Sequence, residues 1–193
     1  MIRKRWQLLM TCVLFLYGSP ASLAQTNTIN LKDALQTTGT VILFRHALAP
    51  GFGDPTNFDV DDCKTQRNLD EQGRAQSKAL GDRFKALGYS SDRVYSSPWC
   101  RCLDTARLMA IGPVEPFNGL GSFFEGHVDR GQTLALLNDK LSDIAELKRQ
   151  PVVMVTHQVV ISAVTGLGTS SGEGILYDPA EDKAYRITIG NND

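Results

Sequence analysis

The sequence predicts an α/β protein, a three-layer sandwich with helices on both faces of a mostly parallel central sheet. Three observations predict this class. Short runs of β-branched and apolar residues at 41–44, 93–96 and 152–155 are typical of buried strands. The segments between these runs carry apolar residues at helical spacing. Strand and helix therefore alternate along the chain, and that alternation favours a parallel sheet covered on both faces.

The N-terminus has the pattern of a secretory leader rather than of a folded element. Basic residues at positions 3 to 5 precede the apolar run Leu8–Tyr17, and small residues surround Ala24, where a signal peptidase would cut. The apolar run is shorter than the ~20 residues of a membrane-spanning helix. We therefore expect residues 1–24 to be a cleavable signal peptide and 25–193 to form a single domain. The mature protein would be periplasmic or secreted, with no stable membrane insertion.

The remaining elements follow from the spacing of apolar residues along the chain. This spacing predicts helices over 71–87, 102–110, 134–147 and 159–164, and a further strand pair over 174–177 and 184–189. The loop 49–67, which holds two glycines, two prolines and several aspartates, is longer than most connections in compact domains. Long loops of this kind are often functional, so we expect this loop to form the rim of a site and to influence specificity.

The net charge and the cysteines limit the possible partners and compartment. A formal net charge of −1 leaves no surplus of lysine and arginine for a nucleic-acid surface, so we expect no nucleic-acid partner. Cys63, Cys100 and Cys102 follow the leader, an odd number for a compartment that oxidises thiols. One disulfide and one free thiol is the simplest interpretation. A zinc site is the weaker alternative, because paired Cys-x-x-Cys spacing is missing.

Cationic or potentially cationic residues follow each of the three buried strands. Arg45 and His46 end the first strand, Arg101 comes shortly after the second, and His157 follows the third. In open α/β sheets, ligands bind beyond the carboxyl ends of the strands, so these four side chains could converge. Guanidinium groups match phosphate oxygens, and a helix start after Pro98 could add backbone N–H groups. The pattern predicts a phosphate site. The alternatives are that His157 caps a helix and that Arg101 lies on a solvated helix face.

Four segments together carry a resemblance to a known family: RHA, RNLDEQGRAQSKALG, SSPWCRCLDTARLM and VTHQVVISAVTG. In this order they resemble the histidine phosphatase superfamily, with its phosphoglycerate-mutase-like fold, over about 41–173. The motifs DCKTQRNL and SSPWCRC are most similar to those of small exported bacterial members. The chain departs from the wider family at Ala47 and Gln158, where glycine is usual. These departures bear on substrate range more than on the core chemistry.

The resemblance implies an exported phosphatase that hydrolyses phosphomonoesters or phosphoramidates through a phosphohistidine on His46. Arg45, Arg101 and His157 would stabilise the oxygens of the transferring group and lower the pKa of His46. Because these groups would neutralise the charge that magnesium neutralises elsewhere, no metal and no cofactor is expected. The expected substrate is a phosphorylated small molecule or an envelope sugar phosphate. The alternatives are a member that binds a phosphorylated ligand without turnover and, less favoured, a mutase.

The resemblance also implies where an acid that protonates the leaving oxygen would lie. The family supplies it between the arginine helix and the last catalytic strand, and here that segment contains GSFFEGHVDR. Glu125 is the first candidate, because the preceding Phe123 and Phe124 would disfavour its charged form. Asp129 and His127 are the alternatives, and small members of the family can lack a clear acid.

The same arrangement bears on the disulfide. If Arg101 points into the pocket, the sulfurs of Cys100 and Cys102 lie to either side of it, and a bridge between residues two apart would be strained. We therefore expect Cys63 to pair with either Cys100 or Cys102. Such a bridge would tie the loop 49–67 to the helix that carries the arginine.

Overall fold

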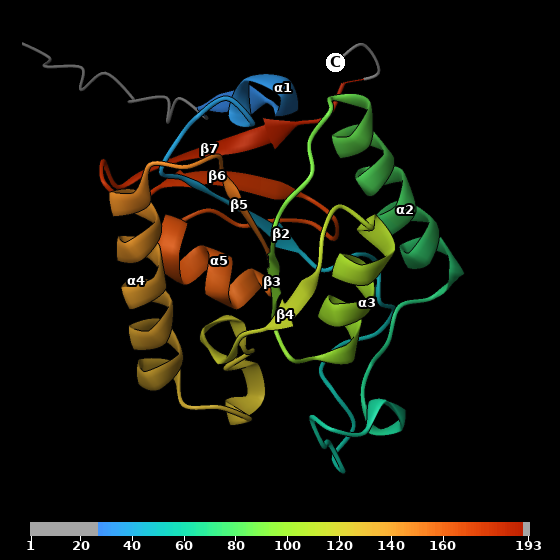
Figure 1. Ribbon diagram of the computed structural model, residues 1–193. Helices are drawn as coiled ribbons and strands as arrows, with labels where there is room; N and C mark the ends of the chain where they lie inside the picture. The colour runs from blue at the N-terminus through green and yellow to red at the C-terminus, as the bar shows by residue number, and fades with distance from the viewer. Residues whose placement is uncertain (1–26, 191–193) are drawn as a thin grey trace, which may run out of the picture.

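The computed structural model describes residues 27–190, which form a seven-stranded sheet with helices on both faces (Figure 1). The predicted signal peptide, residues 1–24, lies outside the described residues. The elements in chain order are β1 (Thr28–Asn30), α1 (Leu31–Ala34), β2 (Val41–Arg45), the 3-10 turn η1 (Cys63–Thr65), α2 (Glu71–Ala86), β3 (Val94–Ser96), α3 (Cys100–Met109), β4 (Val114–Pro116), the 3-10 turns η2 (Asn118–Leu120) and η3 (Phe124–Gly126), α4 (Arg130–Leu147), β5 (Val152–Thr156), α5 (Gln158–Thr165), β6 (Gly174–Asp178) and β7 (Lys183–Thr188).

The predicted α/β class and the mostly parallel sheet are confirmed. The strands lie in the order β1-β7-β6-β2-β5-β3-β4, and β2, β5, β3 and β4 run parallel to one another. Strand β6 is antiparallel to both β2 and β7, while β1 pairs in parallel with β7. Because β2, β5 and β3 are adjacent and parallel, the segments that follow them emerge at the same edge of the sheet.

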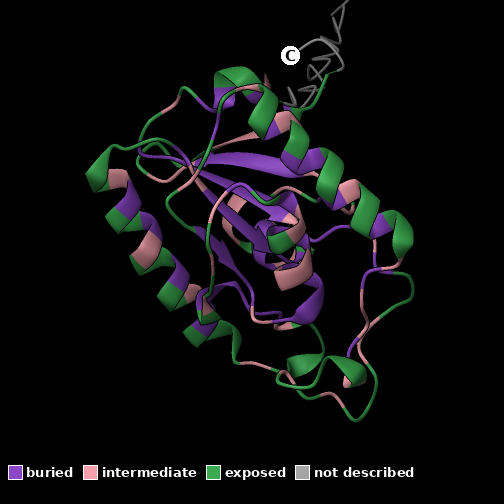
Figure 2. Ribbon diagram, turned by 45° about the vertical axis from the view of Figure 1, so that its right-hand side comes forward, coloured by how far each residue is buried: buried purple, intermediate pink, exposed green. Residues whose placement is uncertain are grey.

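Alternating side chains of the central strands divide the core into two layers. Ile42 and Phe44 of β2 pack with α1, α2 and α3, whereas Val41 and Leu43 pack with α4 and α5. In β5, Met154 faces the α4 and α5 side. Figure 1 shows the helices on the two faces of the sheet, and Figure 2 shows the central strands between them as the most continuously buried part of the fold. A strand buried on both faces needs apolar residues at every position, which explains its uninterrupted apolar run.

Short elements and helix ends account for the differences from the sequence prediction. β1, α1 and β4 contain three or four residues each, too few to show a period. Helix α3 begins at Cys100 rather than at residue 102. Helix α4 begins at Arg130 rather than at residue 134, because the Asp129 side chain accepts a hydrogen bond from the Gln132 N–H and caps the earlier turn.

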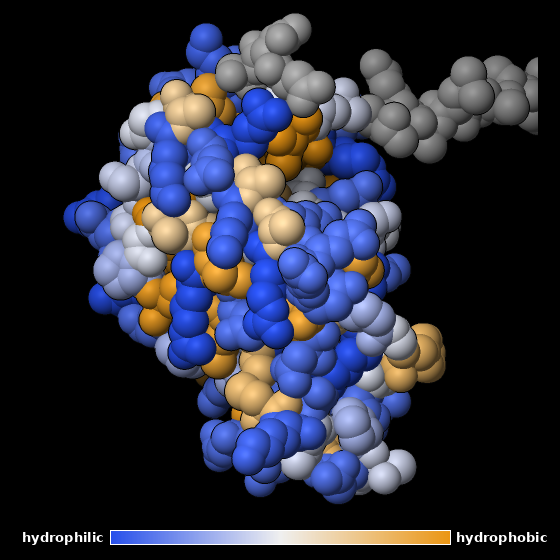
Figure 3. Space-filling view, turned by 90° about the vertical axis from the view of Figure 1, so that its right-hand side faces the viewer, coloured by the Kyte–Doolittle hydropathy of each residue, from blue (hydrophilic) through white to orange (hydrophobic). Residues whose placement is uncertain are grey.

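Two glycines allow helix α2 to pack closely against its neighbours. A Cβ on Gly73 would lie 2.0 Å from the carbonyl oxygen of Leu48, and one on Gly81 would lie 1.9 Å from that of Met109. Backbone contact at both points positions α2 against α3 and against the segment that follows His46. The outer face of these two helices is mostly hydrophilic, with scattered hydrophobic residues (Figure 3). Among the described helices, none combines the length and apolar composition needed to cross a bilayer.

The loop 49–67 is attached to the start of α3 by a disulfide between Cys63 and Cys100, whose Cα atoms are 5.7 Å apart. The prediction that Cys63 pairs with one of the two helix cysteines is confirmed. Cys102 is buried and is the free thiol of the described chain. The Gln66 side chain also accepts a hydrogen bond from the Cys100 N–H, 2.9 Å away. Loop and helix are therefore held together at two neighbouring points.

Replacing both Cys63 and Cys100 with serine should lower the free energy of unfolding by about 3–4 kcal/mol, because the bridge spans 37 residues and restricts the unfolded chain. Urea denaturation with and without a reductant measures this. The control is Cys102→Ala, which should keep the sensitivity of the wild type to reduction. An equal effect of the reductant on the wild type and on the double variant would contradict the prediction.

Candidate active site

The four predicted residues converge at the carboxyl edge of the sheet. Arg45 ends β2, His46 follows it, His157 follows β5, and Arg101 lies in the first turn of α3. The rings of His46 and His157 have their centroids 5.6 Å apart. His46, Arg101 and His157 are only 2%, 3% and 4% exposed. Arg101 is therefore not on a solvated face. His157 is the N-cap residue of α5, but its side chain makes no capping hydrogen bond.

The His46 ring is oriented by its own strand end. Its Nδ1 lies 2.8 Å from the carbonyl oxygen of Ala47, and since a carbonyl can only accept, Nδ1 carries the hydrogen. The Ala47 N–H in turn donates to Thr105 Oγ1, 3.0 Å away, which holds this backbone against α3. The unprotonated nitrogen of neutral His46 is therefore Nε2. Its lone pair is available to an electrophile.

Both histidines are held in the neutral state. Burial, followed by the charges of Arg101, Arg67 and Arg45, lowers the pKa of His46 to about 3, although the Ala47 carbonyl opposes the shift. Burial, then Arg101 and the other cationic neighbours, lowers the pKa of His157 well below its usual value. A neutral His46 can act as a nucleophile at physiological pH, whereas a protonated one cannot.

His157 contacts side chains of α3 and of the segment between β3 and α3. Its Nε2 lies 2.8 Å from Ser97 Oγ and 3.5 Å from the sulfur of Cys102. The centroid of the Trp99 ring is 5.3 Å from that of His157, nearly perpendicular to it. Ser97 was not predicted from the sequence as a partner of this histidine. The SSP motif was its signal, because it places a hydroxyl at the end of β3, next to β5.

Asp54 from the long loop holds Arg101 in place. Its Oδ1 and Oδ2 accept hydrogen bonds from Arg101 Nη1 and Nη2 at 2.7 and 3.1 Å. The carboxylate also accepts from Trp99 Nε1 and from the Arg67 N–H. Burial opposes ionisation of Asp54, but these hydrogen bonds and the Arg101 charge outweigh it and lower the pKa of Asp54. No pattern in the sequence distinguished Asp54 from the other aspartates of the loop.

Two arginine N–H groups in the site have no acceptor among the described residues. Arg45 Nη1 donates to Gln158 Oε1 and to the Thr169 carbonyl, yet its Nε has no partner. Arg101 uses both Nη atoms on Asp54, and its buried Nε likewise has no partner. Leaving buried N–H groups unpaired is costly, so such groups usually find a partner, which can be a bound ligand, an ion or water. These donors are suited to an anion with several oxygens.

A third arginine, Arg67, approaches the same region from the loop. Its Nε donates to the Gly53 carbonyl at 2.9 Å, and its Nη1 donates to the Ala49 carbonyl. Burial and the charges of Arg101 and Arg45 lower the pKa of Arg67. The two charge effects show that the three arginines lie close together. Arg67 was predicted only to lie in the loop 49–67 that influences specificity. Its charge adds to the anion-binding character of the site.

Glu125 lies near the site, at the position where η3 meets the loop. Its Oε2 accepts a hydrogen bond from the Asp54 N–H at 3.0 Å and lies 3.6 Å from His127 Nε2. These contacts are polar, unlike the apolar surroundings expected from its aromatic neighbours. Phe124 instead packs edge-on against Phe52. Asp129, the alternative acid, caps α4.

Among the described residues, Asp54, Glu125 and His127 form a group whose ligand atoms lie within 4.8 Å of one another. The donor set does not suit a metal ion, because both Asp54 oxygens already accept from Arg101. The guanidinium charge would also repel a cation at that point. The three side chains are better explained as the polar contacts that hold the loop against η3.

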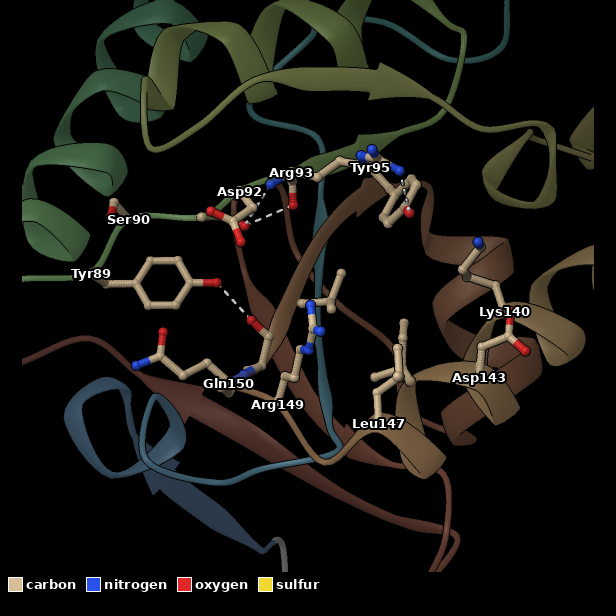
Figure 4. Close-up of a pocket in the computed structure, with 14 residues that line it drawn as sticks. Tyr89, Ser90, Asp92, Arg93, Tyr95, Lys140, Asp143, Leu147, Arg149 and Gln150 are labelled. Carbon is tan, nitrogen blue, oxygen red and sulfur yellow. Dashed lines mark hydrogen bonds between the residues drawn. The ribbon is translucent and has the colours of Figure 1, made fainter.

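Two large hollows are lined by none of Arg45, His46, Arg101 and His157. One, of about 800 Å³, lies at the amino ends of β3 and β5 and contains none of the four predicted residues (Figure 4). There the Tyr89 hydroxyl donates to the Pro151 carbonyl, and Lys140 lies near Tyr95. The other, of about 770 Å³, is lined by Trp99, whose ring contacts His157. Only the second therefore adjoins the candidate site.

Comparisons with known proteins support the family and the fold. The family model described as the histidine phosphatase superfamily (branch 1) matches residues 41–139. No curated protein matches the chain. The fold is similar to that of the protein histidine phosphatase SixA with tungstate, at 15% identity over 76% of this chain and 93% of that chain, with a TM-score of 0.54. A mycobacterial glucosyl-3-phosphoglycerate phosphatase with inorganic phosphate shares 14% identity over 78% and 96%, with a TM-score of 0.53.

Neither His46 nor His157 should titrate between about pH 5 and 8, in contrast to the usual histidine pKa near 6.5. Below about pH 6.5 these two histidines bind protons in the unfolded chain but not in the folded one. The free energy of unfolding should therefore decrease as the pH falls below that value. The loss should reach about 1.4 kcal/mol per pH unit for each histidine. NMR titration of the imidazole signals and urea denaturation between about pH 7 and 4 measure the two effects.

The matched variant is His46→Asn, which cannot titrate in this range and should show a shallower loss of stability with acid. A titration midpoint near 6.5 for both imidazoles in the wild type would contradict the prediction.

Proposed function

Because the chain belongs to the histidine phosphatase superfamily, we propose that it is a phosphatase that hydrolyses phosphomonoesters or phosphoramidates through a phosphohistidine on His46. One observation carries the proposal. The neutral His46, with its lone pair on Nε2, lies close to Arg45 and Arg101, whose buried Nε donors have no partner in the described residues. A phosphoryl group has the charge to bind these donors and the electrophilic centre to accept the lone pair.

The reaction has two steps. In the first, His46 Nε2 attacks phosphorus, the bond from phosphorus to the leaving oxygen or nitrogen breaks, and the leaving group takes up a proton. In the second, water attacks the phosphohistidine, and inorganic phosphate and neutral His46 are released. Arg45, Arg67 and Arg101 stabilise the negative charge on the phosphoryl oxygens in both steps. No step requires a metal ion.

Asp54 acts through Arg101 and is a positioning residue. The hydrogen bonds to Asp54 occupy the end of the guanidinium, through Nη1 and Nη2. The edge formed by Nε and Nη2 therefore remains for two phosphoryl oxygens. His157 supplies a further donor. If the Ser97 hydroxyl donates to Nε2, the ring hydrogen of neutral His157 lies on Nδ1 and can donate to the phosphoryl group.

Separate observations support the proposed proton donor, export of the protein and its independence from metals. Glu125 is proposed as the proton donor because its contacts with Asp54 and His127 hold it beside the Arg101 partner. Export is supported by the disulfide, which is typical of oxidising compartments, and by the predicted leader. Independence from metals is supported by the gathered arginines, which perform the charge neutralisation.

A brief incubation with a ³²P-labelled phosphomonoester should label the wild type, and the label should be base-stable and acid-labile, as a phosphohistidine is. His46→Ala should carry no label, because the attacking nitrogen is gone. Labelling should be unchanged in EDTA. A protein that takes up no label and hydrolyses no member of a broad substrate panel would instead be a non-catalytic binder of phosphorylated ligands.

Glu125→Gln should slow hydrolysis of an alkyl phosphate by about 10²-fold or more, while p-nitrophenyl phosphate, whose leaving group scarcely needs a proton, should lose far less. Steady-state kcat on the two substrates measures the difference. Asp129→Asn is the matched control, since its carboxylate caps α4. Equal rates for the wild type and Glu125→Gln on the alkyl phosphate would remove Glu125 from this role.

A further inference from the structure

The hollow beside Trp99 has a composition unlike that of the phosphate site. It lies between the loop 49–67, η2 and the start of α4, and its volume of about 770 Å³ falls within the range of small-molecule sites. No lysine or arginine lines it, whereas two carboxylates do. The hollow of Figure 4 is different, because Arg93, Lys140 and Arg149 all line it. The hollow beside Trp99 therefore disfavours anionic ligands.

Uncharged hydrogen-bonding side chains make up much of its wall. They are Thr56 and Asn57 from the loop, Asn118 from η2 and Gln132 from α4. Within residues 27–190, none of these four side chains has a hydrogen-bond partner. Amides and hydroxyls both donate and accept, which suits ligand hydroxyl groups that also do both. Leu136, which is exposed, adds an apolar surface on which the C–H groups of a ligand can pack.

This hollow adjoins the proposed leaving-group side of the reaction. Trp99 lines it and also contacts the His157 ring. His127 lines it too, and its Nε2 lies 3.6 Å from the carboxylate of Glu125, the proposed proton donor. The group that departs with the donated proton must lie next to that donor. The departing half of the substrate would therefore extend toward the hollow.

We propose that the hollow beside Trp99 binds the leaving-group half of the substrate, and that this half is an uncharged polyhydroxylated group such as a sugar. The inference rests on the proposed phosphatase function and names its substrate class. Sugar monophosphates would bind through phosphate on the arginines and hydroxyls on the amides. Substrates with a second phosphate or a carboxylate would meet Asp59 and Asp129 without a compensating cation.

Binding is tested apart from turnover, with His46→Ala of the mature chain and isothermal titration calorimetry. Hexose 6-phosphate should bind at least about tenfold more tightly than 3-phosphoglycerate, whose carboxylate the hollow disfavours. Combining Gln132→Lys with His46→Ala should reduce this preference by about tenfold, because the added cation would attract the carboxylate of 3-phosphoglycerate. Gln150→Lys, which introduces the same charge in the hollow of Figure 4, is the matched control and should leave the preference unchanged.

Hydrolysis of p-nitrophenyl phosphate by the wild type is measured in parallel, because it reports the proposed function alone. Equal affinity for the two ligands would overturn the inference whatever the hydrolysis result. So would a preference that Gln132→Lys and Gln150→Lys change alike, because the charge effect would then not be local. A preference lost only in Gln132→Lys supports the hollow as the sugar site, even in a protein that hydrolyses nothing.

Discussion

Arg101 carries its charge into a region where only 3% of its side chain reaches solvent, and the Asp54 carboxylate makes this burial tolerable. An unpaired guanidinium there would cost several kcal/mol, so the pair must form as the loop closes over α3. Asp54 also accepts from Trp99 and from the Arg67 backbone, so one carboxylate fixes the arginine, the aromatic wall and the loop. The order of an otherwise irregular segment depends on this interaction.

The same charge that needs Asp54 also acts on the two histidines. Burial is the main reason that the pKa values of His46 and His157 are low, and Arg101 is the next cause for each. The site thus keeps the proposed nucleophile unprotonated with groups that also attract an anion. Asp54 balances one positive charge without neutralising the others, since Arg45 and Arg67 lie close enough to lower the pKa of His46 further.

The sequence predicted the parts of the site that follow from sheet geometry. Arg45 ends one parallel strand, and His46 and His157 directly follow parallel strands, so their meeting at one edge needed only the strand assignments. Asp54 could not be predicted, because a loop has no period and several aspartates were equivalent candidates. The disulfide partner was ambiguous because Cys100 and Cys102 are two residues apart on one helix, and such residues point to nearly opposite sides. Cys100 faces the loop, whereas the Cys102 sulfur lies 3.6 Å from the Thr156 carbonyl of β5.

Because Cys102 faces inward, the reactivity of its thiol reports the separation of α3 from β5. Its thiol is fully buried, and burial raises its pKa to about 12, so little thiolate is present at neutral pH and no reagent reaches it in the closed fold. Alkylation therefore requires α3 to separate from β5. When closing is fast relative to alkylation, the alkylation rate reports the free energy of that separation, at the junction between sheet and helix where the two histidines lie.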